Sequence, residues 1–282
     1  MIIVSTSGFS YADWEGSFYP TGIKKQEQLP FFARFFPAVE LNYTYYSPPG
    51  EKGIAGHLNH APGMRFAVKG HSSFTHKRNY GEREKDIYRA ALNQLREKDA
   101  LIALLLQFPY SFHATTFNLK YLEKLLGEFE GFPVAVEFRH SKWKSRKIYE
   151  FMKERNTTLV TTDAPALANL FRGGWESVGP FSYVRLHGRN SEKWWEHEQS
   201  WERYDYLYTS KEIAGMAAAI EKLATEESED GTSEKTESAR DVFVFFNNHW
   251  QVKAVINAIQ LAAKLGLKID IEGLPEEVKK RL

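Results

Sequence analysis

The sequence predicts a single α/β domain, a (β/α)8 TIM barrel that spans residues 1–282. Eight short, apolar, β-rich runs recur along the chain, and the segments between them carry apolar residues at helical spacing. Most gaps between successive runs suit a βα unit of about 30 residues and are too long for hairpins. Eight alternations of this kind close most simply as a barrel. A doubly wound open sheet is the alternative, although no glycine-rich phosphate turn follows the first run.

The expected strands cover residues 2–6, 38–42, 65–69, 101–106, 134–138, 158–161, 182–186 and 241–246. Helices are expected between them because apolar side chains fall on one face, as Leu119, Leu122 and Leu126 do. The same spacing occurs at Ile87, Ala91 and Leu95, at Ile148 and Met152, at Ile213, Met216 and Ile220, and at Val252, Val255 and Ile259. The long gap before the last strand contains a polar, acidic stretch at 226–238, which predicts a flexible, solvated loop.

The composition excludes several classes of site. Lysine and arginine number 37 against 36 aspartate and glutamate residues, so a nucleic-acid partner requires a local basic patch. The absence of cysteine removes disulfides, thiolate metal sites, iron–sulfur clusters and cysteine nucleophiles. The first residues do not resemble a signal peptide, and the apolar run 100–106 is far shorter than the roughly 18 residues that span a membrane. We therefore expect a cytoplasmic protein without a membrane partner, and its oligomeric state stays open.

Polar residues gather where the predicted strands end. In a parallel barrel the carboxyl ends of all strands meet at one face, and ligand sites lie there. Side chains two residues apart point to the same side of a strand, so Glu40 is expected beside Asn42. The same parity joins Glu137 to Arg139 and Arg185 to His187. The mouth of the barrel is therefore expected to hold Glu40, Asn42, Lys69, Gln107, Glu137, Arg139, Arg185, His187 and Asn247, with Asp163 nearby.

The charges of this set favour an anionic or polyhydroxylated small molecule as the ligand. Three acids meet three permanent cations there, and the cations oppose a divalent metal, so neither a metal nor a cofactor is predicted. Glu40, Glu137 and His187 are the candidate catalytic residues, as acids, bases or proton carriers. The candidate ligand contacts are Asn42, Lys69, Gln107, Arg139, Asp163, Arg185 and Asn247. The alternative is a structural ion-pair network that plugs the barrel without catalysis, so enzymatic activity stays an open question.

A basic stretch at 139–147 supplies a second hypothesis. It places five lysine or arginine residues within nine positions, and Ser141 is a candidate N-cap for the helix that follows. Trp143 could offer a stacking surface beside these charges, which suits a nucleic-acid-binding or processing protein, with metal-dependent barrel nucleases as a fold-level analogy. Trp14 and other aromatic residues in the predicted loops are candidate walls for a sugar or base. His57, His60, His71 and His76 are interpreted as loop residues.

Several motifs in order along the chain resemble the YecE-like family, a bacterial and archaeal family of unknown function. They are Ser7-Gly8 with Tyr11, Trp14 and Phe18-Tyr19-Pro20; Val39-Glu40-Leu41-Asn42 with Tyr46; Phe66-Ala67-Val68-Lys69 with Thr75-His76; Gln107-Phe108-Pro109; Val136-Glu137-Phe138-Arg139-His140 with Trp143; Arg185-Leu186-His187-Gly188; and Phe246-Asn247-Asn248. The sequence departs from the family pattern at Phe9, Tyr43 and Tyr110, outside the charged set. The resemblance implies a TIM barrel and supplies no reaction.

Overall fold

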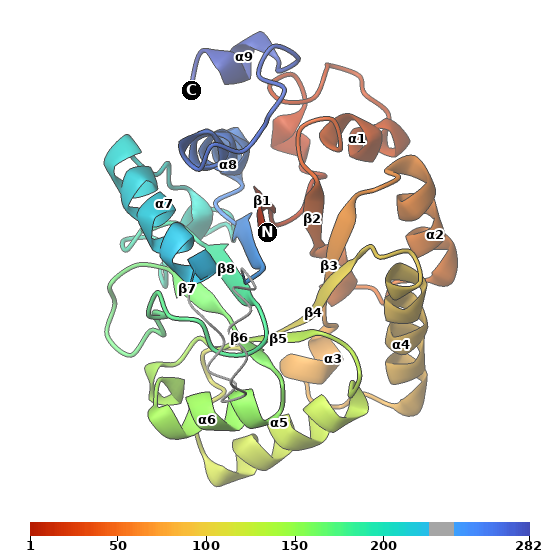
Figure 1. Ribbon diagram of the computed structural model, residues 1–282, viewed down its shortest axis with the longest axis vertical. Helices are drawn as coiled ribbons and strands as arrows, with labels where there is room; N and C mark the ends of the chain where they lie inside the picture. The colour runs from red at the N-terminus through yellow and green to blue at the C-terminus, as the bar shows by residue number, and fades with distance from the viewer. Residues whose placement is uncertain (226–239) are drawn as a thin grey trace.

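Parallel strands lie at the centre of the computed structural model, which describes residues 1–225 and 240–282 (Figure 1). The strands are β1 Ile2–Thr6, β2 Ala38–Leu41, β3 Arg65–Lys69, β4 Leu101–Gln107, β5 Val134–Glu137, β6 Thr158–Leu159, β7 Thr161–Asp163, β8 Ser182–Leu186 and β9 Val242–Phe246. They form one sheet of order β1-β9-β8-β7 and another of order β2-β3-β4-β5-β6, with parallel ladders throughout. The parallel α/β class is thus confirmed, and the predicted loop at 226–238 lies outside the described residues.

Two local contacts bring the edges of the sheets together. An isolated parallel bridge pairs Ser7 with Glu40, and the Gly8 N–H donates to the Glu40 carbonyl at 2.8 Å, which links the end of β1 to β2. At the other edge β6 and β7 are separated by Val160 alone, and its N–H donates to the Val136 carbonyl at 2.9 Å. The predicted strand 158–161 is therefore observed as two pieces, because β6 pairs with β5 while β7 pairs with β8.

Helices surround the strands (Figure 1). They are α1 Lys25–Phe32, α2 Glu51–His60, α3 Ser72–Thr75, α4 Glu82–Arg96, α5 Thr116–Glu128, α6 Arg146–Glu154, α7 Ser210–Thr225, α8 Lys253–Lys264 and α9 Glu276–Lys279, with 3-10 turns η1 Ala12–Trp14, η2 Tyr43–Tyr45, η3 Ser141–Trp143, η4 Glu202–Tyr204 and η5 Trp250–Val252. The predicted apolar faces are buried, as Leu95, Leu122 and Ile220 show. Within the described ranges no helix is both long and apolar enough to cross a membrane.

Strand parity separates two apolar layers. One set of side chains, such as Val4, Leu41 and Val68, packs with the helices, because it belongs to the same cluster as the buried helix faces. The alternate set packs on the opposite side of the strands and comprises Ile3, Ala38, Ala67, Ala103, Leu105, Ala135, Val160, Phe181, Tyr183, Phe243 and Phe245. Ile102 joins this cluster out of parity, at the register shift between β3 and β4. Residues two positions further along the strands have the same parity as this inner layer, and many of them are polar. The inner layer therefore leads directly into the site.

Candidate functional site

The inner columns of the strands change from apolar to polar at their carboxyl ends. Ala38 is followed on its own side by Glu40 and Asn42, and Ala67 is followed by Lys69. Four more strands continue in the same way. Leu105 is followed by Gln107, and Ala135 by Glu137 and Arg139. Tyr183 is followed by Arg185 and His187, and Phe245 by Asn247. The structure thus gathers the predicted strand-end residues at one end of the sheets.

Arg185 is the centre of a buried ion network. Its Nε donates to Glu40 Oε2 at 2.9 Å and its Nη2 to Glu40 Oε1 at 2.7 Å, which is a bidentate pair. Its Nη1 donates to Glu137 Oε2 at 2.5 Å, and the Tyr183 hydroxyl donates to Glu40 Oε2 at 2.8 Å. All four side chains are at most 1% exposed. The paired charges compensate for a burial that an isolated ion could not sustain.

The second oxygen of Glu137 joins this network to two further groups. Arg139 Nε lies 2.6 Å from Glu137 Oε1, and His187 Nε2 lies 3.1 Å from the same oxygen. The Asn247 amide nitrogen lies 3.0 Å from His187 Nδ1. When this amide donates to Nδ1, the imidazole carries its proton on Nε2 and donates it to Glu137. Burial alone would raise the pKa of Glu137, but Arg139 and Arg185 hold it well below its usual range. Burial, aided by the charge of Arg139, lowers the pKa of His187 to about 3.

Glu40 and Glu137 are enclosed beneath the site rather than open to it. Both carboxylates are 0% exposed, and their oxygens are occupied by the arginine, tyrosine and histidine partners. A carboxylate that is fully enclosed and whose oxygens are already hydrogen-bonded is poorly suited to exchange protons with a ligand. The predicted acid and base roles of Glu40, Glu137 and the neutral His187 therefore lack support in the geometry. The buried cluster instead matches the alternative of a structural ion-pair network.

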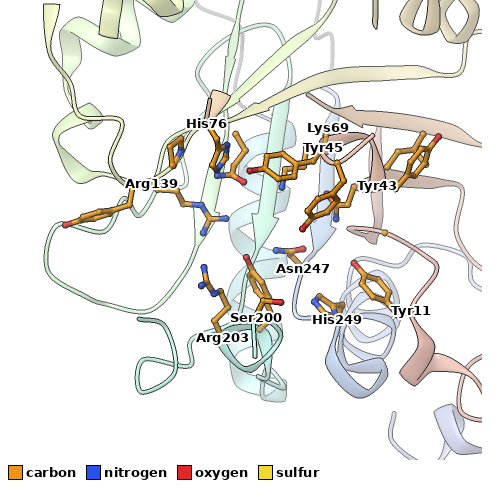
Figure 2. Close-up of a pocket in the computed structure, with 18 of the residues that line it drawn as sticks. Tyr11, Tyr43, Tyr45, Lys69, His76, Arg139, Ser200, Arg203, Asn247 and His249 are labelled. Carbon is orange, nitrogen blue, oxygen red and sulfur yellow. The ribbon is translucent and has the colours of Figure 1, made fainter. Parts of the chain in front are cut away.

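Above the network lies a pocket of about 710 Å³ (Figure 2). Its lining comprises Gly8, Phe9, Ser10, Tyr11, Leu41, Asn42, Tyr43, Tyr45, Tyr46, Lys69, His76, Gln107, Pro109, Tyr110, Arg139, Leu170, Trp194, Trp195, Ser200, Arg203, Tyr204, Asn247 and His249. Asn42, Lys69, Gln107, Arg139 and Asn247 are the predicted site residues that reach it. None of the lining residues is an aspartate or a glutamate, so its formal charges are all positive.

Trp14, Trp143, Asp163 and Arg185 were predicted as ligand contacts, but the structure does not place them among the residues that line the pocket. Trp14 is fully buried, and its indole N–H donates to the His249 carbonyl at 2.8 Å. Trp143 is equally buried and stacks on Phe138 with ring centroids 4.1 Å apart. Both tryptophans are core residues because a large apolar ring gains more from burial than from exposure in a loop.

Asp163 is committed to a separate cluster beside the site. Arg189 binds it through Nε at 2.9 Å and Nη2 at 2.7 Å, and the Tyr208 hydroxyl donates to it at 2.9 Å. Arg189 also bonds Glu212 in α7 at 2.8 Å. Asp163 therefore ties the end of β7 to the segment after β8, and Arg189 links that segment to α7.

The basic stretch 139–147 is organised differently from its predicted form. Ser141 begins the turn η3, and the helix α6 is capped by Ser145, whose Oγ accepts from the Ile148 N–H at 3.4 Å. Arg139 enters the pocket, whereas Lys142, Lys144, Arg146 and Lys147 are exposed. Because Trp143 is buried, this surface has charge without the stacking residue on which the nucleic-acid hypothesis relied.

Lys69 ends β3 inside the pocket. Its ammonium lies 4.9 Å from the centroid of the Tyr45 ring (Figure 2), and no carboxylate of the described residues lies within ion-pair distance of it. Burial, followed by the charge of Arg185, lowers the pKa of Lys69 to about 8. His76 stands edge-on to the same Tyr45 ring at 5.0 Å, and burial together with the charge of Lys69 lowers its pKa to about 4. His76 lies in the turn after α3, as expected for a loop residue, and it is a neutral residue of the pocket lining, whereas His57 and His60 lie in the helix α2 rather than in a loop.

Loop residues complete the opposite wall, and sequence reasoning did not find two of them, Arg203 and Tyr204. The Arg139 guanidinium lies 5.7 Å from the Trp194 ring, Trp194 lies 6.4 Å from Tyr204, and Arg203 lies 5.9 Å from Tyr204. Arg203 and Tyr204 come from η4, in a long irregular segment whose sequence carries no periodic signal. Trp194, by contrast, was detectable as a loop aromatic.

The segment after β9 is under backbone strain where it borders the pocket. His249 stacks on Tyr11 with ring centroids 4.3 Å apart and an interplanar angle of 4° (Figure 2). Shortly after it, Gln251 and Val252 adopt φ values of 50° and 66°, a left-handed conformation that is unfavourable for a β-branched residue. Such strain persists only where the surroundings enforce it, and it is found disproportionately at functional sites.

Comparison with known proteins places the chain in a family. A family model described as "Protein of unknown function DUF72" matches residues 3–280. The chain belongs to the DUF72 family. This confirms the resemblance to YecE-like proteins, and the names and motifs of the family supply no reaction for this DUF72 chain.

Relatives of this DUF72 protein extend over nearly its whole length. A DUF72 protein of known structure from Thermotoga maritima is 34% identical, with a TM-score of 0.82 over 94% of this chain and 99% of its own. Another from Enterococcus faecalis is 29% identical, with a TM-score of 0.80 over 96% of this chain and 97% of its own. The UPF0759 protein YunF of Bacillus subtilis (strain 168) is 26% identical over 288 residues, which cover 95% of this chain and 96% of YunF.

Acidification is expected to destabilise this DUF72 protein before its carboxylates titrate. The pKa of His187 is about 3 in the folded protein and about 6.5 in an unfolded chain, so between these values only the unfolded chain takes up the proton. The free energy of unfolding therefore decreases as the pH is lowered, by up to about 1.4 kcal/mol per pH unit for this histidine. Urea unfolding at several pH values from 6.5 to 5 measures the slope. His187→Gln should make the slope shallower by about half a proton at pH 6.5 and by nearly one proton at pH 5. An unchanged slope would contradict the buried neutral imidazole.

Proposed function

We propose that this protein binds a small organic anion in the pocket at the carboxyl ends of the strands. One observation carries this proposal: Lys69, Arg139 and Arg203 line a pocket whose lining contains no carboxylate. A concave site with charges of one sign concentrates ligands of the opposite sign. Phosphate and carboxylate groups are the anions that arginine and lysine recognise most effectively.

The carboxylates of the buried network do not neutralise the positive charges of the pocket. Glu137 forms ion pairs with both Arg139 and Arg185, and Glu40 forms an ion pair with Arg185. These two carboxylates therefore neutralise only the two guanidinium groups. Among the described residues Lys69 and Arg203 have no acidic partner within ion-pair distance, since Arg203 contacts His197 at 2.5 Å instead. The site with its floor thus has an excess of positive charge, which favours an anionic ligand over a neutral one.

The remaining walls suit a ligand with hydroxyl or ring groups. Tyr45, Trp194 and Tyr204 offer flat apolar faces to the pocket. The Oδ1 atom of Asn42 is buried and has no hydrogen-bond partner among the described residues, so it can accept a bond from a ligand hydroxyl. A sugar phosphate or a hydroxylated carboxylic acid combines these features.

The buried network has a role in this proposal. Glu137 fixes the Nε of Arg139, and His187 receives the amide of Asn247, so two lining residues are held by groups beneath them. Support of this kind keeps a binding group in position before the ligand arrives. We further propose that the sheets close as one (β/α)8 barrel, supported by the Ser7–Glu40 bridge and by Arg185 of one sheet pairing with Glu40 and Glu137 of the other.

Arg203→Gln tests the proposal with little risk to the fold, because Arg203 has no carboxylate partner among the described residues. Loss of one charge-assisted contact of about 1.5–3 kcal/mol is expected to weaken binding roughly 10- to 100-fold. Isothermal titration with citrate, glucose 6-phosphate and uncharged glucose at fixed ionic strength measures the effect. Arg146→Gln is the matched control, because Arg146 is 92% exposed in its ion pair with Glu150, outside the pocket. Equal losses in both variants, or tighter binding of glucose than of either anion, would contradict anion binding in the pocket.

A further inference from the structure

We infer that Lys69 is a nucleophile that forms an imine with an aldehyde or ketone carrying an anionic group. This inference rests on the proposed function, because the anionic part of the substrate would be held by the same pocket. In the proposed function Lys69 acts only as a positive charge that contacts the anion, whereas here its amine takes part in a reaction.

Lys69 is placed on a rigid element. It is the last residue of β3, whose ladders to β2 and β4 pair Val68 with Leu41 and with Leu104, and Lys69 itself with Leu105. Its side chain then extends into the pocket beside Tyr45, from η2 (Figure 2). A reactive group at the end of a strand is held more accurately than one on a loop, and barrel enzymes place such groups at this end.

The surroundings of Lys69 favour its uncharged form. The charged or titratable groups around it are Tyr45 from η2, His76 after α3, Arg139 after β5, Arg185 from β8, Glu40 from β2 and Glu137 from β5. Both carboxylates are bonded to arginine, so they do not pair with the lysine. Burial and two nearby guanidinium groups lower the pKa of Lys69 to about 8, and a free amine is therefore available at neutral to slightly alkaline pH.

The lysine differs from the arginines of the pocket in this respect. The guanidinium groups of Arg139 and Arg203 keep their charge at any physiological pH and can serve only as anion contacts. Lys69 alone among the cations lining the pocket can present a nitrogen lone pair. The pocket thus combines permanent anion holders with one potential nucleophile, which is the set that an anionic carbonyl compound requires.

The covalent step balances without a further reactant. The Lys69 nitrogen lone pair forms a bond to the carbonyl carbon, and the C=O π electrons move to oxygen, which takes up a proton to give a carbinolamine. Loss of the hydroxyl group as water, together with the proton from nitrogen, leaves the imine, so amine and carbonyl give imine and water. His76, which is neutral because its pKa is about 4, lies against the same Tyr45 ring and can relay these protons through solvent.

Trapping with the full chain tests the inference. Pyruvate and glyceraldehyde 3-phosphate are added at pH 8 with sodium cyanoborohydride, and the reduced adduct is located by peptide mass spectrometry. We expect the adduct mainly at Lys69, suppressed by citrate and absent from Lys69→Arg and Lys69→Met. Lys142→Arg is the matched control, because Lys142 is exposed outside the pocket, and it should keep the adduct. Labelling spread over surface lysines, equal in wild type and in Lys69→Arg, would overturn the inference.

A second reagent removes the dependence on the choice of carbonyl compound. Trinitrobenzenesulfonate is an aromatic anion that reacts only with uncharged amines, so its rate at each lysine follows that amine's protonation. We expect Lys69 to react first, with a midpoint near pH 8. A midpoint near the ordinary value of about 10.4 would overturn the inference. If citrate binds by titration while neither reagent modifies Lys69, the anion pocket stands and the imine fails; if citrate and glucose 6-phosphate also fail to bind, the proposed function fails as well.

Discussion

Arg185→Met is expected to lower the free energy of unfolding by about 3–5 kcal/mol, because it leaves buried carboxylates without their partner. Arg185 supplies both bonds of the bidentate pair to Glu40 and one of the bonds to Glu137, and all three side chains are at most 1% exposed. Methionine fills a similar volume, so the loss reflects the uncompensated charges rather than a cavity. Urea unfolding at pH 7 measures it.

A second substitution separates charge from packing at this position. Glu40→Gln added to Arg185→Met removes one of the stranded carboxylates, so the double variant should be more stable than Arg185→Met alone. The Tyr183 hydroxyl can still donate to the amide oxygen of the new glutamine. Arg146→Met, at a 92% exposed position, should change stability by no more than about 1 kcal/mol. A double variant less stable than the single one would show that the network does not act through its charges.

Lys69→Met is expected to weaken binding of citrate or glucose 6-phosphate roughly 10- to 100-fold, because it removes a charge-assisted contact of about 1.5–3 kcal/mol. Its stability should stay within about 1 kcal/mol of the wild type or rise above it. Lys69 has no carboxylate partner among the described residues, and its charge faces Arg139 and Arg185. Titration calorimetry and urea unfolding of the same preparation measure both quantities.

This pairing of results distinguishes a binding residue from a structural one. Replacing a structural lysine would destabilise the protein, whereas replacing Lys69 should weaken anion binding without loss of stability. Lys142→Met serves as the matched control for charge, since Lys142 is exposed and lies outside the pocket. A large loss of stability in Lys69→Met with unchanged anion binding would assign Lys69 to the ion network instead.

Strand parity was the part of the site that the sequence could define. Polar residues that follow apolar ones at intervals of two, as Glu40 and Asn42 do, must lie on the same side of a strand. Because parallel strands share one carboxyl end, this rule gathered residues from distant segments such as Lys69 and Asn247. Both indeed line the pocket.

Depth along the strand was not available from parity. Glu40 and Asn42 share a side, yet Glu40 is enclosed in the network while Asn42 reaches the pocket. The difference is set by how many inner side chains lie between a residue and the open end, which depends on the stagger of all the strands. The acid and base roles predicted for Glu40 and Glu137 therefore have no support in the geometry, although both residues lie on the inner side of the strands as expected.

Loops and caps set a second limit. Trp14, Trp143 and Trp194 all occur in predicted loops, so the sequence does not distinguish them. Long-range packing places Trp14 and Trp143 in the core, whereas Trp194 lines the pocket. Ser141 and Ser145 are both plausible N-caps in the sequence. Ser141 lies within the turn η3, so Ser145 is the residue that caps α6. Arg203 reaches the pocket from a segment without periodicity, so no local pattern could indicate it.

The proposed preference of the pocket for anions is tested most directly by anomalous diffraction from crystals soaked in selenate, a tetrahedral oxyanion whose selenium position can be measured. We predict a selenium peak inside the pocket, within hydrogen-bond distance of Lys69 and of Arg139 or Arg203 (Figure 2). The peak should be lost in Lys69→Met and displaced by citrate. Selenium peaks confined to the exposed lysines and arginines of 142–147, with none in the pocket, would contradict anion binding at the carboxyl ends of the strands.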